Sequence, residues 1–222
     1  LAHDLRNPII GINKTLTSLK TTFGASRPET VERTLLDLIS GSELLLGMVN
    51  DVLDVYLNSY EELPLIISSF PLVDAVEEAI KLLRIEAEEK RIRVFVDSER
   101  EQMSLQIHGD KRRLQRVFIN LLDNAIKYSG SSGNVYITFK TTVEEHTDYL
   151  IFCIEDEGIG IHPSKLLKIF EPLYQKVGKK DSKMGTGLGL YFCKVVIDAH
   201  HGKIWAENRK DRGAALFIKI PL

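Results

Sequence analysis

The chain of 222 residues lacks several features that mark particular classes of protein. It has no uninterrupted apolar run of about 18 residues, so no segment of it is predicted to span a membrane. Its two cysteines, Cys153 and Cys193, lie far apart and form no CxxC pair, which argues against a zinc site or a disulfide framework. Free thiols fit a reducing compartment. We therefore expect a cytoplasmic fragment, with any membrane attachment made by segments outside this chain.

An excess of charge of either sign is also missing. Lys and Arg total 29, Asp and Glu total 31, and the net charge is −2. This balance argues against a dedicated nucleic-acid-binding protein. No HExxH or GxSxG motif occurs, so zinc-hydrolase and serine-hydrolase chemistry have no support. Because 44% of the residues are hydrophobic, the chain can build a substantial core, which excludes global disorder.

The first 60 residues are predicted to form an antiparallel pair of amphipathic helices. Apolar residues spaced three and four apart run from Leu1 to Phe23, and again from Val31 to Tyr56. The second helix has more apolar surface than one partner helix can cover. We therefore expect an all-α helical hairpin that dimerises into a four-helix bundle.

Strand and helix patterns alternate in residues 61–222, beyond a linker near Tyr60–Pro64. The predicted strands are 65–70, 91–97, 104–108, 134–145, 149–156, 203–208 and 214–220. The predicted helices are 71–90, 110–129, 163–170 and 187–200, with Asp110 capping the second and His200 the last. Strands that neighbour in sequence, interspersed with helices, indicate an α+β sandwich with a mixed sheet and helices on one face.

His3 faces away from the apolar seam of the first predicted helix. Asp4 is adjacent to it, Asn7 lies one turn further along the same face, and Pro8 should bend the helix there. One interpretation is a solvated histidine on a bundle surface. The other is an exposed imidazole that attacks a substrate with one ring nitrogen, while the Asp4 carboxylate holds the other.

The predicted helix 110–129 places Asn120, Asn124 and Lys127 together on the side opposite its apolar residues. Asparagine is disfavoured inside helices, so two of them one turn apart indicate a ligand site. Amide oxygens suit Mg²⁺ and a lysine ammonium suits a phosphate. An ordinary polar helix face remains the alternative.

A second candidate segment, Asp156–Gly160, follows a predicted apolar strand. A carboxylate at Asp156 can accept a hydrogen bond from the exocyclic amine of adenine, whereas the carbonyl of guanine would repel it. Gly158 and Gly160 allow the chain to turn tightly and approach a ligand closely. A plain loop is the alternative here.

A third candidate segment opens the last predicted helix and reads Gly185-Thr186-Gly187-Leu188-Gly189. Glycines at a helix N-terminus expose backbone N–H groups to a phosphate. The GxGxG spacing fits neither the P-loop nor the dinucleotide fingerprint. The polar segment before it contains Lys176 and other lysines, which predicts a mobile lid over phosphates.

The order of these segments is specific. AHDLRNP (2–8), NLLDNAIKYS (120–129), DEGIG (156–160), FEP (170–172) and GTGLGL (185–190) resemble the H, N, G1, F and G2 boxes of sensor histidine kinases of two-component systems. The resemblance covers nearly the whole chain. It implies a dimerisation and histidine-phosphotransfer hairpin in residues 1–60, then a catalytic ATP-binding domain in residues 61–222 of the kind shared with Hsp90, MutL and gyrase B.

The resemblance also implies an activity and a role for each site residue. The chain would phosphorylate its own histidine with ATP and Mg²⁺, pass the phosphoryl group to an aspartate on a response regulator receiver domain, and dephosphorylate that regulator. His3 would be the phosphoacceptor, Asp4 its base and Asn7 the residue that positions a water. Asn124 would bind Mg²⁺. The implied nucleotide-binding residues are Asn120, Asn124, Lys127, Tyr128, Asp156, Gly158, Gly160, Phe170, Lys176, Gly185, Thr186, Gly187, Leu188 and Gly189.

One departure and two alternative functions accompany this interpretation. Many members read FEPFYR, whereas this chain has Leu173 and Gln175, so Lys176 would replace the arginine as a point charge. An ATP-driven clamp of the Hsp90–MutL kind is one alternative, but it has no use for an exposed HD..NP segment. A non-catalytic scaffold is the other, and the intact Asn124 and Asp156 argue against it.

Overall fold

The computed structural model describes residues 63–97, 105–172, 174 and 187–222, together with residues 12, 15–17, 19, 31, 35, 38 and 42. The chain divides into two compact units, Leu1–Tyr60 and Glu61–Leu222, limits that coincide with the two predicted regions. The described residues of the first unit are all helical. How its two predicted helices pair lies outside the described residues.

The second unit contains the following elements. Its helices are α3 (Leu72–Leu82), α4 (Arg84–Glu89), α5 (Lys111–Tyr128) and α6 (Gly189–Ala199), with short 3₁₀ turns at η3 (Pro163–Lys165) and η4 (Lys168–Phe170). Its strands are β1 (Ser68–Pro71), β2 (Arg93–Asp97), β3 (Gln106–Gly109), β4 (Asn134–Glu144), β5 (Thr147–Asp156), β6 (Lys203–Asn208) and β7 (Ala214–Pro221).

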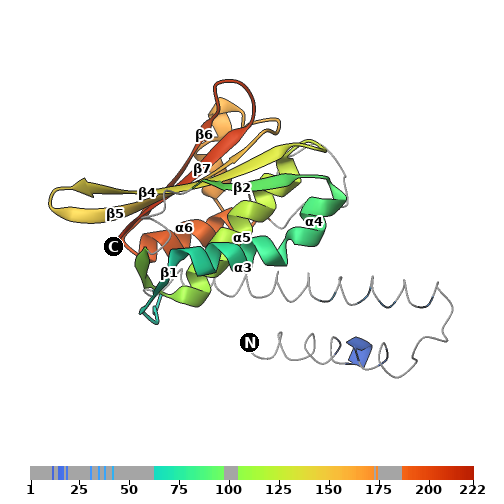
Figure 1. The fold of residues 1–222 in the computed structure, drawn as a ribbon, viewed down its shortest axis with the longest axis horizontal. Helices are drawn as coiled ribbons and strands as arrows, with labels where there is room; N and C mark the ends of the chain where they lie inside the picture. Colours follow the sequence, from blue (N-terminus) through green and yellow to red (C-terminus); the bar gives the residue numbers. More distant parts are fainter. Residues whose placement is uncertain are drawn as a thin grey trace. The chain divides into compact units, whose positions relative to one another are not determined.

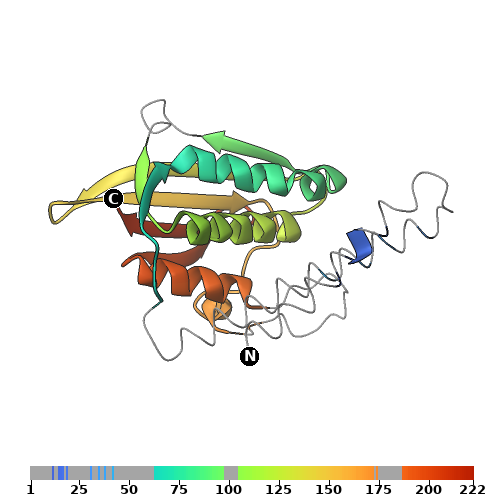
Figure 2. The same cartoon turned by 90° about the horizontal axis from the view of Figure 1, so that it is seen from below.

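Five of these strands form one mixed sheet in the order β2-β4-β5-β7-β6. β2 runs parallel to β4, and the other neighbouring pairs in this sheet are antiparallel. β1 and β3 form a separate antiparallel ribbon. α3, α5 and α6 lie side by side on one face of the sheet (Figures 1 and 2). This arrangement confirms the predicted α+β architecture of the second unit.

Helix α5 lies between α3 and α6 in the helical layer (Figure 2). Its buried side chains recur at helical spacing and are Leu114, Val117, Phe118, Leu121, Leu122, Ala125 and Ile126. They pack against the inward-facing side chains of the sheet, and the ring centroid of Phe118 lies 4.7 Å from that of Phe152 on β5. Because the apolar stripe fixes the rotation of α5, its asparagines are kept off the core side and stay half-buried.

Three predicted elements differ in detail from the structure. The predicted helix 71–90 is divided at Leu83, whose backbone leaves helical geometry at φ −98° and ψ 10°. The predicted helix 163–170 is the pair of 3₁₀ turns η3 and η4. The last helix begins at Gly189 rather than at 187, because Gly187 has a φ of +72° that an α-helix does not accommodate.

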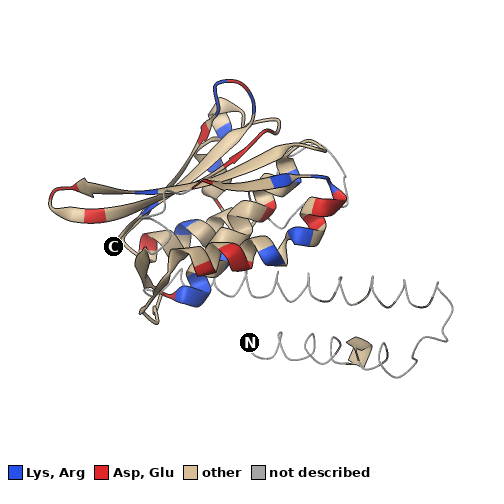
Figure 3. Cartoon of the chain, viewed as in Figure 1, with Lys and Arg blue, Asp and Glu red and all other residues tan. Residues whose placement is uncertain are grey.

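Acidic and basic residues are interspersed over the helices and loops of the second unit (Figure 3). Among the described helices, none combines the length and the apolar character needed to cross a membrane.

Both cysteines are buried. Burial raises the pKa of the Cys193 thiol to about 12, so this thiol stays protonated and behaves as a small apolar side chain.

Candidate functional site

Helix α5 carries the predicted asparagines and is fixed at both of its ends. At its start, the Asp110 side chain accepts a hydrogen bond from the backbone N–H of Arg113 at 3.1 Å, which confirms the predicted N-cap. At its end, Lys90 Nζ donates to the carbonyl oxygens of Ile126 and Lys127 at 2.8 Å each. A cation at this position satisfies carbonyls that lack a partner within the helix. The candidate site is therefore built on a rigid element.

The side-chain amides of Asn120 and Asn124 both form hydrogen bonds within the protein. Asn124 Nδ2 donates to the carbonyl of Asn120 at 2.8 Å, and Asn120 Nδ2 donates to the carbonyl of Gly189 at 3.4 Å. These bonds engage the nitrogen atoms, and the Asn120 side chain also forms a hydrogen bond with the Cys193 thiol. Asn124 Oδ1 is therefore the amide oxygen that the described contacts leave to accept from or coordinate a ligand. The bond to Gly189 also joins α5 to the first residue of α6. The structure thus brings together two predicted segments that lie 69 residues apart in the sequence.

The donor set fits Mg²⁺ in one specific way. The described residues include no cluster of three or more His, Cys, Asp or Glu side chains that could hold a metal. A neutral amide oxygen from Asn124 is a suitable hard ligand, but it is too little to bind the ion without other oxygens. The phosphates of a nucleotide would supply those oxygens, so the site fits a metal that arrives with the nucleotide.

Lys127 and Tyr128 lie at the exposed end of the same helix. Lys127 Nζ is 2.5 Å from Asp123 Oδ2 one turn earlier, so its ammonium is paired with a carboxylate of its own helix. Tyr128 is 49% exposed. Contact of either side chain with a nucleotide stays a prediction, and Lys127 would have to exchange Asp123 for a phosphate.

The Asp156 carboxylate is buried at the end of β5, with 6% of the residue exposed. The backbone N–H groups of Gly158 and Ala214 donate to Oδ1 at 2.7 and 3.4 Å, and neither bond uses Oδ2. Burial raises the pKa of this carboxyl above its usual value, against the opposing effect of the two N–H groups and of Arg209. The result is a carboxylate with one oxygen bonded to the backbone and the other left to accept a donor.

The loop after Asp156 passes closely against the end of α5. A Cβ on Gly158 would lie 2.1 Å from the carbonyl oxygen of Tyr128, so only glycine fits here. Gly160 has a φ of +68°, which also favours glycine. Gly158 therefore brings the Asp156 loop to the C-terminal end of α5.

The remaining predicted residues fall into two groups. Phe170 is buried in η4, and η4 packs against α6, while Leu188 is the N-cap residue of that helix. The other group lies outside the described residues and consists of His3, Asp4, Asn7, Lys176, Gly185 and Thr186. Their roles stay predictions.

Several residues around the Asp156 loop have no counterpart among the predicted site residues. Glu157 accepts hydrogen bonds from the backbone N–H and Nδ2 of Asn134, both at 3.0 Å, and from Tyr136 Oη at 3.1 Å. These bonds lower the pKa of the Glu157 carboxyl, with the Asn134 side chain contributing most. Arg209 and Arg212 donate to carbonyls of the same loop. The sequence gives no signal for these contacts because they join segments that are distant along the chain.

Comparison with known proteins identifies the class of protein that this fold and site define. Residues 109–222 match the model of the histidine kinase-, DNA gyrase B- and HSP90-like ATPase family, and the chain belongs to that family. Within it, the likeness is to sensor histidine kinases. The chain is 29% identical over its whole length to the sensor histidine kinase RcsC of Escherichia coli K12 and 30% identical to the alginate biosynthesis sensor protein KinB of Pseudomonas aeruginosa.

The matched proteins are longer than this chain, which spans 23% of RcsC and 36% of KinB. Among solved structures, histidine kinase ThkA in complex with response regulator protein TrrA is 27% identical, with a TM-score of 0.64. That match covers 99% of this chain and 59% of the ThkA chain. The likeness therefore includes the first unit as well as the ATPase-like unit.

Proposed function

We propose that this chain is the kinase region of a sensor histidine kinase, which transfers the γ-phosphoryl group of ATP to His3 and then to an aspartate of a response regulator. In the first step a ring nitrogen of His3 attacks the γ-phosphorus, while Asp4 takes the proton from the other ring nitrogen. A P–N bond forms, the P–O bond to the β-phosphate breaks, and ADP leaves. In the second step the regulator carboxylate displaces His3 from the phosphorus.

The observation that carries this proposal is the set of polar atoms along the second half of α5. Asn124 has an amide oxygen left over, and Asn120, one turn earlier, is joined to the first residue of α6 by its bond to Gly189. The Asp156 loop lies against the same end of α5. An acceptor for an adenine amine, an oxygen for Mg²⁺ and a helix N-terminus for phosphates therefore lie on α5 or on segments that contact it.

Each of these groups has a distinct task on this proposal. Asp156 Oδ2 accepts the hydrogen bond from the base. Asn124 Oδ1 holds Mg²⁺ together with the phosphate oxygens, and the ion offsets phosphate charge as the phosphoryl group departs. The segment from Lys176 to Gly189 excludes water from the phosphates.

A homodimer formed by the first unit is part of the proposal. Four of its predicted apolar positions are exposed within a single chain, with Ile12 at 52%, Leu19 at 37%, Val31 at 44% and Leu38 at 51%. Leu35 and Ser42 are buried. Exposed apolar side chains at helical spacing support a second copy of this chain as their cover.

A response regulator receiver domain is the proposed acceptor of the phosphoryl group. The support is the solved structure of histidine kinase ThkA, which is a complex with response regulator protein TrrA. We also propose a phosphatase activity toward the phosphorylated regulator, in which the Asn7 amide holds a water in line with the phosphorus. Its support is the position of Asn7 one turn beyond His3 in the sequence.

The test of the kinase proposal is incubation of the chain with γ-labelled ATP and Mg²⁺. The expected product is acid-labile, base-stable phosphate on the protein, absent from His3→Gln and with ATP binding retained in that variant. An ATP-driven clamp would release labelled phosphate without labelling the protein, and a scaffold would do neither. Either result would overturn the proposal.

The phosphatase proposal has a separate test. Asn7→Ala should still be labelled by ATP and still label the regulator, but the labelled regulator should decay about 10²-fold more slowly than with the unaltered chain, since one water is misoriented. The measurement is the decay of phospho-regulator at equal protein concentrations. Equal decay rates, or loss of labelling and decay together, would contradict the role of Asn7.

A further inference from the structure

The last residue of β6 and the loop that follows it lie against the Asp156 loop. We call residues 208–213 the backing loop. Arg209 Nη1 donates to the carbonyl of Asp156 and Arg212 Nε donates to the carbonyl of Gly158, both at 3.2 Å. Two guanidinium groups from one loop therefore bind alternate carbonyls of the other, across 53 and 54 residues of sequence.

The two ends of the backing loop add further contacts with residues 156–161. Asn208 Oδ1 accepts from the N–H of Ile161 at 2.7 Å and Asn208 Nδ2 donates to its carbonyl at 2.5 Å. At the other end, Gly213 has a φ of +97°, and a Cβ there would lie 1.8 Å from the carbonyl oxygen of Asp156. Glycine is thus required for the close approach that lets the next N–H, of Ala214, reach Asp156 Oδ1.

The contacts of Arg209 extend to the outer face of the sheet. Its guanidinium carbon lies 5.4 Å from the centroid of the Tyr136 ring, and Tyr136 Oη donates to Glu157. Stacking on an aromatic ring restricts the arginine side chain. Arg209 therefore fixes the loop on one side of Asp156, while Tyr136 and Asn134 hold Glu157 on the other.

We propose that Arg209 and Arg212 are positioning residues for nucleotide base recognition. By holding the carbonyls on either side of Glu157 they keep Oδ1 of Asp156 on its two N–H donors, so that Oδ2 alone faces the base. Neither arginine needs to touch the nucleotide for this role. The inference rests on the proposed function, because it assumes that Asp156 binds adenine.

This role predicts weaker binding of the adenine base and unchanged binding of the phosphates. The proposed phosphate and metal groups belong to α5 and the start of α6, and no described contact joins Arg209 or Arg212 to Asn120, Asn124 or Gly189. Loosening the Asp156 loop should therefore selectively weaken the binding of adenine nucleotides. A general loss of folding would instead lower the fraction of active protein without changing the discrimination between bases.

The experiment compares ATP and GTP binding by titration calorimetry in the presence of Mg²⁺ for the full chain, Arg209→Gln and Arg212→Gln. Each variant should bind ATP about three- to tenfold more weakly, the size expected for one lost charged hydrogen bond. GTP binding should stay unchanged, so the ratio of the two affinities should fall. Arg209→Lys keeps a cationic donor and should recover most of the ATP affinity.

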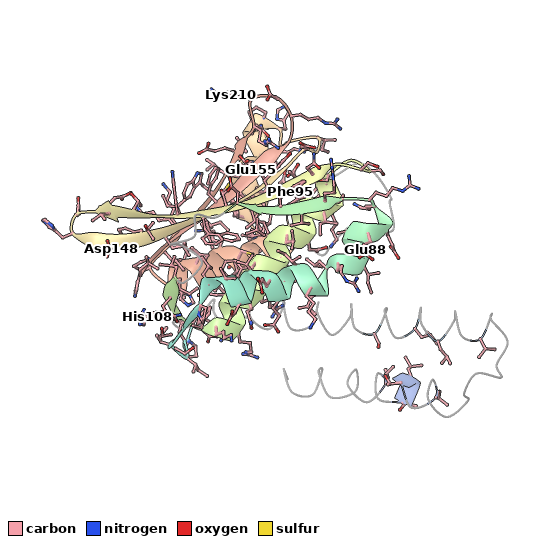
Figure 4. The ribbon with its side chains drawn as sticks, viewed as in Figure 1. Glu88, Phe95, His108, Asp148, Glu155 and Lys210 are labelled. Carbon is pink, nitrogen blue, oxygen red and sulfur yellow. The ribbon has the colours of Figure 1, made fainter. Side chains whose placement is uncertain are left out.

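Lys210→Gln is the matched control, because it removes one positive charge from the same loop. Lys210 is exposed at the tip of the backing loop (Figure 4), and its variant should bind both nucleotides like the unaltered chain. Unchanged ATP affinity in both arginine variants, or an equal loss for ATP and GTP, would overturn the inference. If the unaltered chain does not bind ATP, the proposed function is wrong and the inference falls with it.

Discussion

The two ends of helix α5 use their polar side chains in opposite ways. At the first end, Asp110 Oδ1 accepts from the N–H of Arg113, Oδ2 accepts from the N–H of Ile66 at 3.1 Å, and the backbone N–H of Asp110 donates to His200 Nε2 at 3.0 Å. Towards the second end, Asn124 uses its nitrogen on the carbonyl of Asn120 and leaves its oxygen without a described partner.

The difference separates polar side chains whose hydrogen bonds are completed within the chain from one that keeps an acceptor atom for the proposed ligand. His200 belongs to the first kind, because its Nδ1 lies 2.7 Å from the carbonyl of Val196 while Nε2 accepts from Asp110. Both ring nitrogens are used, which fixes the imidazole in one neutral tautomer. A buried polar group whose bonds are completed within the chain contributes stability, and one left with an acceptor is a candidate for chemistry.

The largest effect that tests this comparison is expected from Asn124→Ala in the second half of α5. Autophosphorylation should fall by about 10²-fold or more, because Mg²⁺ loses its protein ligand. The melting temperature should hold, since alanine is the better helix former and offsets the lost bond to Asn120. Radiolabelling and calorimetric melting measure the two quantities. A variant that melts early while its remaining folded fraction stays fully active would contradict the assignment.

The reciprocal change at the other end is Asp110→Ala. It removes the N-cap and the partner of Ile66, so the free energy of unfolding should fall by about 2 kcal/mol. The ATP dissociation constant of the folded protein should not change. Urea denaturation and nucleotide titration test the two halves. The control is Glu77→Ala on the exposed face of α3, where a loss within about 0.5 kcal/mol is expected.

A pH series sharpens the comparison further. Burial lowers the pKa of His200 below 6.5, and the nearby Arg113 and His201 act in the same direction, against Val196 and Asp110. A histidine whose folded pKa is depressed contributes stability that is fully present above the unfolded pKa and is lost as the pH falls. The unaltered chain should therefore lose stability below about pH 6.5 more steeply than His200→Gln. Denaturation midpoints from pH 7.5 to 5 measure this, and parallel curves would rule the linkage out.

The smallest expected effect lies away from both ends of α5. The turn between β4 and β5 consists of Glu145 and His146, with φ values of +48° and +69°, which is the geometry that Asn-Gly favours. The double change Glu145→Asn with His146→Gly should stabilise the second unit by about 0.5–1 kcal/mol. It should leave ATP affinity unchanged. Loss of stability in urea denaturation would show that the contacts of Glu145 and His146 stabilise the protein more than the improved turn geometry does.

The parts of the fold that the sequence predicted well depend on local patterns. The Asp110 cap, the apolar stripe of α5 and the β6–β7 hairpin all follow from residues close together in the chain. The cap role of His200 was also predicted, but not its bond to Asp110, which crosses 90 residues. Periodicity carries no information about partners at that distance.

The residues of the candidate site also differ in whether the local sequence predicts them. Asn124 and Asp156 are visible in the sequence because each is an unusual residue type for its local position. Arg209 and Arg212 are ordinary residues in a polar turn, and their contacts form only when β5 and β7 pair and bring the two loops together. The division of residues 71–90 at Leu83 was missed for a third reason, since no proline or glycine marks it.

The parallel strand β2 has a consequence for the order in which the second unit assembles. β4 with β5, and β6 with β7, are hairpins that can close over short loops, whereas β2 pairs with β4 across about 40 residues that include α5. Within the described sheet, β2 also has a neighbour on one side only. Pairing β2 with β4 must offset the entropy lost in closing this long loop. β2 should therefore be the last strand to join the sheet and the first to open. The amide hydrogens of Arg93–Asp97 should accordingly exchange with solvent before those at the centre of the sheet.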